Sequence, residues 1–349
     1  MLRAYSHQRG LTLVELMVSL TLGLVILSAL TYVYIGSRQS YQVNEQLARL
    51  QESGRFALEY LSQDMRMASF AGCRSRNLSA ENDTLFNITA DPPVVYTGPD
   101  ALQGFENGAG WSNPSSVTRA AGDVLSVRRA SSLAVPLAAN ADFGTRSLTV
   151  LNNALGIGHH DLVLLANCER AMLFRVTNHP APTPPGHHPT TLAFSSAGNL
   201  DALTVPPFSQ ASRAEVLRFS SLSFFVGAAP DGRRALYRSD GNQAEALVDG
   251  VIDMELTFAL DDSVPADGVA DRYLPASAIK ASAPNEWPKV TGVRVSLLVA
   301  SEEANLASQP MSYALRDLDG DGVADAETAV DRRLYQVFTT TVALRNRVL

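Results

Sequence analysis

The first part of the chain carries one long apolar run. From Leu16 to Ile35 there are twenty residues without a charge, and more than half of them are Leu, Val or Ile. At 1.5 Å of rise per residue, such a run makes about 30 Å of helix, which matches the hydrocarbon core of a bilayer. The pattern predicts one membrane-spanning segment. Because the sequence has no second run of this kind, it excludes a polytopic membrane protein.

A helical stripe continues beyond the apolar run. Polar residues take over at 37–40, yet apolar and small residues still recur at steps of three and four, which marks one face of a helix. The first proline is Pro92, so no proline breaks this helix early. We predict one helix from about Leu11 to Phe70, ending near Gly72, whose second half packs its stripe on a globular head. The stripe consists of Val43, Leu47, Leu50, Gly54, Ala57, Leu58, Leu61, Met65 and Ala68.

The rest of the chain, about 73–349, is predicted to consist mostly of strands, several with the apolar–polar period of two. Connections rich in Gly, Pro, Asn and Ser separate them. The most proline-rich connection, 178–190, has the composition of a loop or linker and is expected to divide the head into 73–180 and 190–349. The predicted strands are Val124–Arg128, Ser147–Leu151, Asp161–Ala166, Ala171–Thr177, Glu215–Val226, Ala235–Arg238, Ile252–Leu260, Val290–Ala300 and Leu334–Leu344.

These patterns predict an α+β fold in which a long N-terminal helix packs on a large β-rich head. The chain has 349 residues, 46% of them hydrophobic and 18% charged, which is too apolar for a disordered chain. The net charge of -7 disfavours a surface that binds nucleic acid by neutralising phosphates. The sequence has no nucleophile elbow, phosphate loop or metalloprotease helix motif, so we expect no enzymatic activity.

Glu15 lies within the apolar stretch, where a carboxylate costs roughly 2.5–3.5 kcal/mol. A cleaved secretory signal peptide does not fit, because the apolar region is too long and no small-x-small cleavage site follows it. A plain membrane anchor leaves Glu15 unexplained. Arg3 and Arg9 precede the span, which places the N-terminus in the cytoplasm and the bulk of the chain outside.

The stretch from Arg9 to Leu16, Arg-Gly-Leu-Thr-Leu-Val-Glu-Leu, closely resembles the prepilin signal of type IV pilins and type II secretion pseudopilins. The resemblance implies that a prepilin peptidase cuts after Gly10 on the cytoplasmic face and that the new N-terminal residue, Leu11, is methylated. It also makes Glu15 the hallmark glutamate of the mature chain. The family usually has Phe at the position of Leu11.

Glu15 is expected to pair with the α-amine that cleavage creates, for a physical reason. Cleavage creates an α-amine at Leu11, and an uncompensated charge of either sign is expensive in an apolar layer. Pairing the amine of one subunit with Glu15 of a neighbour relieves both costs and gives subunits a staggered register of about 6 Å, the rise of four residues. The alternative is that Glu15 pairs with its own amine, one turn away.

Segments of the head resemble PilW-type minor pilins of Gram-negative type IV pili. They are 247–254, 287–290 with the following strand 293–299, and 332–346. Residues 75–160 resemble no family that we can name. The resemblance implies a leader at 1–10, a helix half for the membrane or filament core at 11–37, an amphipathic helix half at 38–72 and a head at 73–349.

The resemblance also implies a place and partners. The protein is expected in the inner membrane with a periplasmic head, and then in a type IV pilus, where it helps to prime assembly. A head far larger than that of a major pilin fits a subunit near the tip. The implied partners are other minor and major pilins, the prepilin peptidase, the inner-membrane assembly platform and a tip adhesin.

Other functions stay open from the sequence alone. A minor pseudopilin of a type II secretion system shares the N-terminal signal. A surface-binding or DNA-binding module carried on a pilus is a second alternative, although the acidic balance argues against DNA. An anchored periplasmic enzyme would need a clustered polar site, which the sequence does not show.

An acidic loop begins at Asp317. Acids stand at loop positions 1, 3, 5 and 9, with Gly322 at position 6, which is the ligand order of an EF-hand-type calcium loop. Position 12 is Thr328 instead of a bidentate Glu, so the alternative is a solvated acidic turn. A similar pentapeptide at 267–271 is interpreted as a turn only. No cofactor is required, and calcium is the one candidate. Its candidate ligands are Asp317, Asp319, Asp321 and Asp325.

The two cysteines, Cys73 and Cys168, are too few for a disulfide scaffold or a four-cysteine zinc site. They are candidates for one disulfide that ties the exit of the helix to the head, because the chain beyond Ile35 is expected to face the oxidising periplasm. The alternative is two buried free thiols.

Overall fold

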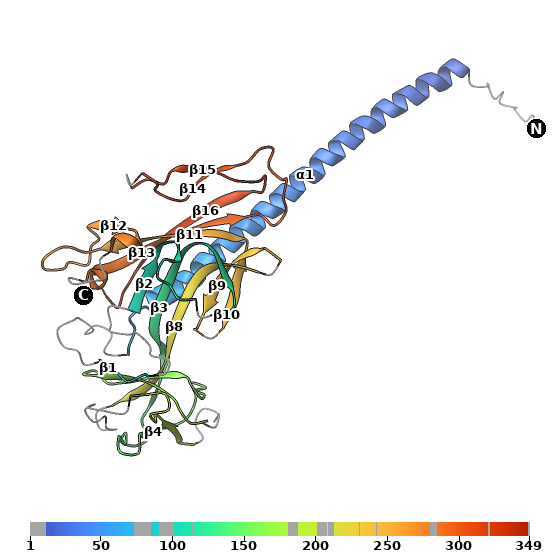
Figure 1. Cartoon of the computed structure of the whole chain (residues 1–349). Coiled ribbons are helices and arrows are strands. Elements are labelled where there is room, and N and C mark those ends of the chain that lie inside the picture. The colour runs from blue at the N-terminus through green and yellow to red at the C-terminus, as the bar shows by residue number, and fades with distance from the viewer. Residues whose placement is uncertain are drawn as a thin grey trace, which may run out of the picture.

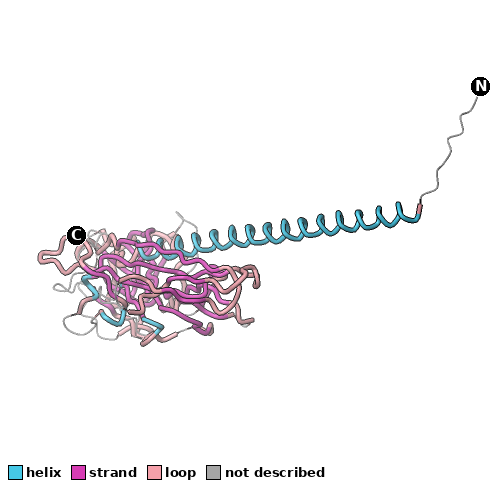
Figure 2. The backbone as a smooth tube through the Cα atoms, turned by 90° about the horizontal axis from the view of Figure 1, so that it is seen from above, coloured by secondary structure: helices cyan, strands magenta, loops and turns pink. Residues whose placement is uncertain are grey.

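A single long helix extends from a head made of β-sheets (Figures 1 and 2). The computed structural model of the chain describes residues 12–72, 85–90, 101–113, 115–180, 188–200, 208, 213–229, 231–241, 243–279, 285–319 and 322–347. The helix α1 covers Leu13–Arg66, 54 residues. The predicted fold class is therefore confirmed, with helix ends that differ from the predicted ones by a few residues.

The two halves of α1 have different surroundings. The first half projects from the head, and the second half lies along it (Figure 2). Leu50, Ala57 and Leu61 in the second half are at most 3% exposed, and Val43 and Leu47 pack beside them at the edge of the same core. The predicted stripe is thus the face that packs on the head. The first half is long and apolar enough to cross a membrane.

The larger sheet has the strand order β1-β6-β5-β8-β3-β2, and β9 and β10 extend it beside β8. The pairs are antiparallel except for β1 with β6. A 3-10 turn, Glu106–Gly108, follows β2. The strands are β1 Leu85–Asn87, β2 Leu102–Phe105, β3 Thr118–Pro136, β5 Leu162–Ala166, β6 Ala171–Arg175, β8 Glu215–Ala228, β9 Arg234–Ser239 and β10 Ala244–Asp249.

The smaller sheet has the antiparallel order β12-β11-β13-β16. Two antiparallel pairs lie outside both sheets: β14 with β15, which form a hairpin, and β4 with β7, which are separated in the chain by β5 and β6. The 3-10 turns Ala276–Ala278 and Trp287–Lys289 connect parts of the smaller sheet. The strands are β11 Val251–Leu260, β12 Arg272–Leu274, β13 Val290–Ala300, β16 Tyr335–Ala343, β4 Ser147–Val150, β7 Thr190–Ala193, β14 Ser312–Ala314 and β15 Ala326–Thr328.

The head has two lobes, which the long strands β3 and β8 join (Figure 1). The helix lobe packs the second half of α1, the smaller sheet, β9 and one end of β3 and β8 around one core. The distal lobe packs β4, β5, β6 and β7 around another core. Phe174 before the proline-rich segment 178–190 and Phe194 after it both belong to the distal core. In the described residues, the parts of the chain before and after 178–190 therefore share one hydrophobic core.

Each of the nine predicted strands has a counterpart in the structure, from β3 to β16. The prediction missed short strands such as β1, β12 and β14, of three residues each. Three residues are too few to show a period of two, so these strands depend on their partners rather than on their own pattern.

Candidate functional site

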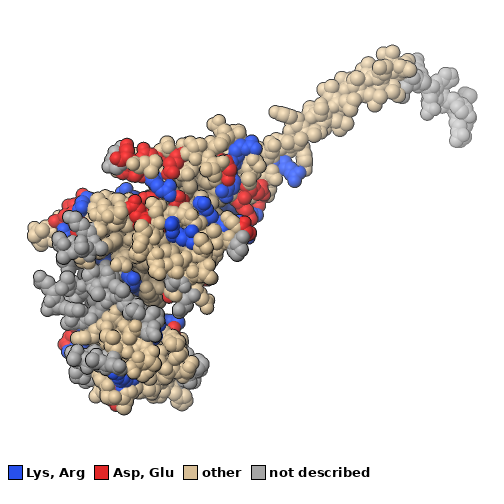
Figure 3. Space-filling view, viewed as in Figure 1, with Lys and Arg blue, Asp and Glu red and all other residues tan. Residues whose placement is uncertain are grey.

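The projecting half of α1 is an exposed apolar surface. Each large hydrophobic side chain between Leu13 and Ile35 is at least 50% exposed. Figure 3 shows this half of the helix almost without charged side chains. Such a surface is unfavourable in water, because apolar area exposed to water costs free energy in proportion to its size. It therefore needs a membrane or other apolar helices around it.

The serine and threonine hydroxyls between Ser19 and Thr31 donate hydrogen bonds within the helix. Ser19 and Thr31 donate hydrogen bonds to the carbonyl oxygens four residues earlier, at 2.7 and 2.8 Å, and Ser28 donates to Val25 O at 2.8 Å. A hydroxyl that bonds to its own helix does not have to be desolvated without a partner when the helix enters lipid. These residues do not impair membrane insertion.

Glu15 takes part in the cap at the N-terminal end of α1. Thr12 is the N-cap: its side chain accepts a hydrogen bond from Glu15 N at 3.2 Å, while Thr12 N donates to Glu15 Oε2 at 3.2 Å. This reciprocal capping box is visible in the sequence as Thr-x-x-Glu, a signal that the sequence analysis did not use. It holds the carboxylate of Glu15 over the first turn of the helix. Gly10 and Leu11 lie outside the described residues, so cleavage and methylation stay predictions.

Three contacts fix α1 on the head. Gly54 faces Phe338 of β16 so closely that an added Cβ would lie 2.5 Å from the Phe338 ring. Asp64, which is 6% exposed, accepts a hydrogen bond from Arg129 Nε at 2.8 Å. Asn346 donates to the carbonyl oxygen of Arg66, the last helical residue, at 3.3 Å, which satisfies part of the C-terminal end of the helix.

The acidic loop lies between β14 and β15, and Figure 3 shows acidic side chains gathered at the end of this hairpin. One carboxylate oxygen from each of Asp317, Asp319 and Asp325 lies within 4.8 Å of the others. The loop turns through two hydrogen bonds to its own acids, from Gly322 N to Asp317 Oδ2 and from Leu318 N to Asp325 Oδ2, both 2.7 Å. The structure thus brings three of the four candidate ligands together. Asp321 lies outside the described residues.

The hairpin is attached to the sheet by an ion-pair network that the sequence analysis missed. Arg316, just before the loop, pairs with Asp253 and with Glu255 of β11, and with Glu327 of β15 at 3.3 Å. Burial, and after it the nearby carboxylate of Asp123, raise the pKa of Glu255 to about 8. No local sequence signal links Arg316 to Asp253, which lies 63 positions earlier. Glu327, the acid nearest to loop position 12, is engaged by Arg316.

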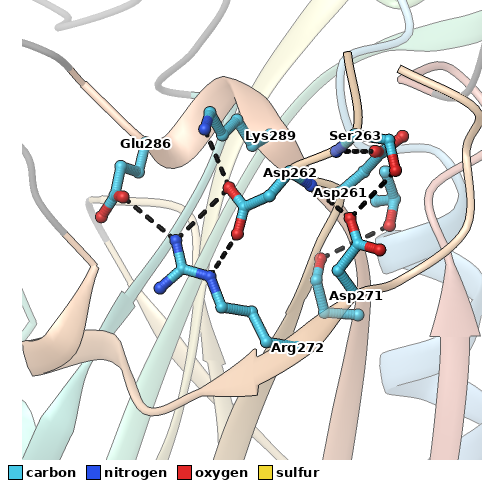
Figure 4. Close-up of polar contacts among 9 residues, drawn as sticks. Asp261, Asp262, Ser263, Asp271, Arg272, Glu286 and Lys289 are labelled. Atoms are coloured by element: carbon cyan, nitrogen blue, oxygen red, sulfur yellow. Dashed lines mark hydrogen bonds and ion pairs between the residues drawn. The ribbon is translucent and has the colours of Figure 1, made fainter. Parts of the chain in front are cut away.

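The similar pentapeptide at 267–271 lies in a bend, residues 261–272, whose acids take part in hydrogen bonds and ion pairs within the bend and with Lys289. Arg272 and Lys289 both pair with Asp262 (Figure 4), and these hydrogen bonds lower its pKa to about 2. Asp271 Oδ2 accepts from Asp262 N at 2.7 Å, and Asp261 Oδ2 accepts from Gly268 N at 2.7 Å. These carboxylates hold a bend together and are not grouped around a shared point.

Cys168 is disulfide-bonded, and it lies in the turn between β5 and β6. The one other cysteine of the chain, Cys73, lies outside the described residues. The Cys73–Cys168 bridge therefore stays a prediction.

Two family models match the chain. The model for type IV pilus-assembly protein W matches residues 223–346, and the model for the prokaryotic N-terminal methylation motif matches residues 5–31. The first match starts inside β8 and includes β9 to β16, so it covers much of the helix lobe and leaves the distal lobe outside. The curated proteins and the solved structures gave no match. The head segments singled out in the sequence, 247–254, 287–299 and 332–346, fall within the first match.

Proposed function

We propose that this chain, which matches the model for type IV pilus-assembly protein W over residues 223–346 and the model for the N-terminal methylation motif over residues 5–31, is a minor pilin that primes pilus assembly and links components at the tip. The family consists of structural assembly proteins. The motif implies processing by the prepilin peptidase and assembly with other pilins. The proposed route starts in the inner membrane and ends in the pilus.

One observation carries this proposal: the apolar half of α1 projects from the head as a single helix with every large hydrophobic side chain exposed. The same surface suits the bilayer before assembly and the helices of other pilins after it. The contacts of Gly54 and Asp64 fix the second half of α1 on the head, and the helix continues without a break into the first half. The head therefore follows the helix rigidly into the filament.

The bulk of the head supports a position near the tip. The distal lobe, built on the far ends of β3 and β8, makes the head longer along these strands (Figure 1). A repeating shaft subunit would have to accommodate this lobe at every step, whereas a tip subunit has neighbours on one side only. The contacts proposed for the head are with other minor pilins, the assembly platform and a tip adhesin.

The experiment compares Glu15→Ala with Glu52→Ala in a strain that lacks the wild-type chain. Glu52 is an exposed glutamate on the second half of the same helix, so it controls for loss of a charge. Cleavage and membrane insertion should persist in both variants, but only Glu15→Ala should be depleted from sheared pili on immunoblots.

Gold-labelled wild-type heads should lie at pilus ends. Labelling along the whole shaft would refute the tip role, and loss of type II secretion without loss of pili would favour a pseudopilin.

We also propose that the acidic loop binds one calcium ion with modest affinity. Three clustered carboxylates repel one another, and a divalent cation relieves that repulsion. Calorimetric melting of the full-length protein in detergent, with calcium and with chelator, tests this. Calcium should raise the melting temperature of the wild type and not of Asp317→Asn with Asp319→Asn. An equal rise in both proteins, or none in the wild type, would refute the site.

A further inference from the structure

The smaller sheet ends in a long edge strand, β16. In the order β12-β11-β13-β16, this strand pairs with β13 on one side only, through nine residue pairs without a register shift. Its sequence, Tyr-Gln-Val-Phe-Thr-Thr-Thr-Val-Ala, contains no charged residue, proline or glycine. A long, regular edge of this kind pairs readily with another chain, so proteins normally blunt their edges with charges, prolines, bulges or short strands. None of these devices is present in β16.

The other edge strands of the two sheets, in the part of the chain that the structure describes, are blunted. Strands β1 and β12 have three residues each, and β2 has four. Strand β10 has a bulge between Ala246 and Val248, and it carries the acids Glu245 and Asp249. The contrast indicates that the edge of β16 is open for a reason other than chain folding.

Every second residue of β16 turns its backbone N–H and C=O groups away from β13. Next to the start of the strand, Ser301 N donates to Leu334 O at 2.8 Å, and after its end Leu344 N donates to Thr291 O at 2.8 Å. The even-numbered residues therefore bond to β13, and the odd-numbered residues point outward. In the described chain, four residues have backbone N–H and C=O groups without a hydrogen-bond partner: Val337, Thr339, Thr341 and Ala343.

Side chains on both faces of this edge are accessible. Thr339 and Thr341 are exposed on one face. On the other face Phe338 packs on Gly54 of α1, yet it stays half-buried. Directly opposite residues of neighbouring strands lie about 4.5–5.5 Å apart, so a strand laid beside β16 would cover the rest of the Phe338 ring. Such a strand would gain apolar contact as well as backbone hydrogen bonds.

A second copy of β16 does not suit this edge. Within the chain β16 and α1 run in the same direction, since Phe338 meets Gly54 and the later Asn346 bonds to Arg66. Two identical edge strands pair symmetrically in the antiparallel sense. The projecting halves of the two α1 helices would then point in opposite directions, and these apolar halves could not enter one membrane or one helix bundle together. The occupant is therefore a strand of a different chain.

The ends of β16 carry positive charge. Arg332 precedes the strand and Arg345 follows it, and both are exposed. Arg332 donates to the neutral amide oxygen of Asn305 at 2.7 Å, and neither arginine has an ion pair with a described carboxylate. A partner strand with an uncharged middle and carboxylates at its ends complements this pattern, because opposite charges across neighbouring strands attract and like charges repel.

We propose that the free edge of β16 binds an extended, acidic-ended segment of a different protein chain, which adds a strand to the smaller sheet. Backbone hydrogen bonds along 337–343 supply the affinity, as in other cases of strand addition. Phe338 and the exposed threonines favour apolar and β-branched side chains in the middle of the segment. The proposal rests on the sheet edge and not on the role in pilus assembly, so each can fail without the other.

The test is a fluorescence-anisotropy titration of the full-length protein in detergent. The probe is a labelled peptide of alternating threonine and valine with aspartates at both ends. Its controls are the same peptide with lysines at both ends and the same peptide with every backbone nitrogen methylated. The aspartate-ended peptide should bind with saturation, at least tenfold more tightly than either control. Equal binding of a control, no binding of the probe, or a dimer of the protein itself that excludes the probe would overturn the proposal.

Two substitutions at one position locate the site. Thr341→Pro removes an outward N–H and leaves the bonds to β13 in place, and proline is tolerated on an edge strand where its nitrogen faces solvent. Thr341→Val keeps the N–H and the shape of the side chain, so it is the matched control. Thr341→Pro should weaken binding of the probe at least tenfold, while Thr341→Val should bind as the wild type does. Equal binding by both variants would overturn the proposal.

Hydrogen exchange of the wild type gives a readout that needs no variant. The outward N–H groups of Val337, Thr339, Thr341 and Ala343 should exchange quickly without the probe and at least tenfold more slowly with it. The N–H groups that bond to β13 should be protected in both states. Unchanged exchange of the outward groups at saturating probe would overturn the proposal even if Thr341→Pro does not fold.

Discussion

Replacing Gly54 by alanine tests how closely α1 is seated on the head. The added Cβ would lie 2.5 Å from Cδ2 and Cε2 of Phe338 and 2.6 Å from its Cγ. Carbon atoms pack at about 3.5–4.0 Å, so either the ring or the helix has to move. The Cγ atom is bonded to the Phe338 Cβ, and a small rotation of the ring cannot remove that contact.

Two effects of opposite sign determine the outcome. In a helix interior, alanine is favoured over glycine by about 1 kcal/mol. Overpacking a filled contact costs about 1–3 kcal/mol. We therefore expect Gly54→Ala to lower the free energy of unfolding by up to about 2 kcal/mol. In a Phe338→Ala background the clash is absent, and the same substitution should instead stabilise the protein by about 1 kcal/mol.

The assay is a double-mutant cycle measured by thermal unfolding of the full-length protein in detergent, with tryptophan fluorescence as the signal. For a domain of this size, 1 kcal/mol corresponds to about 2–4 °C in melting temperature. Gly36→Ala is the control, because its added Cβ would meet no atom within 4 Å. If Gly54→Ala shifts the melting temperature equally with and without the Phe338 ring, the argument for a tight contact is wrong.

Further predictions concern processing, pH and the disulfide. Gly10→Val should block cleavage and leave full-length protein in the membrane, and N-terminal sequencing of mature wild type should begin at Leu11; any other start contradicts the predicted site. The pKa of Glu255 is raised in the folded chain, so the folded chain keeps a proton that the unfolded chain releases at lower pH. The free energy of unfolding should therefore fall as the pH rises from about 5 to about 8. Glu255→Gln should flatten this fall in denaturation curves at several pH values, and an unchanged slope would show that Glu255 does not titrate there. Cys168→Ser should lower the melting temperature, because a bridge to Cys73 closes a loop of nearly a hundred residues, worth up to about 4.7 kcal/mol in the chain-entropy model. Two alkylatable thiols in the non-reduced wild type would rule this bridge out.

The sequence alone determined the features that depend on near neighbours. The apolar run and the stripe that follows it predict α1, because steps of three and four place side chains on one helix face. Alternation with a period of two predicts the longer strands for the same reason. The prepilin motif is a short contiguous segment, so it could be recognised without any structure.

The tertiary structure alone decided which distant residues meet. Asn346 donates a hydrogen bond to the carbonyl oxygen of Arg66, the last residue of α1, which lies 280 residues earlier, and Phe338 of the last strand packs on Gly54. Arg316 links the acidic loop to Asp253 and Glu255 of β11. Strand pairing and register follow from the sum of many weak contacts across the whole core, and no local period in the sequence specifies that sum.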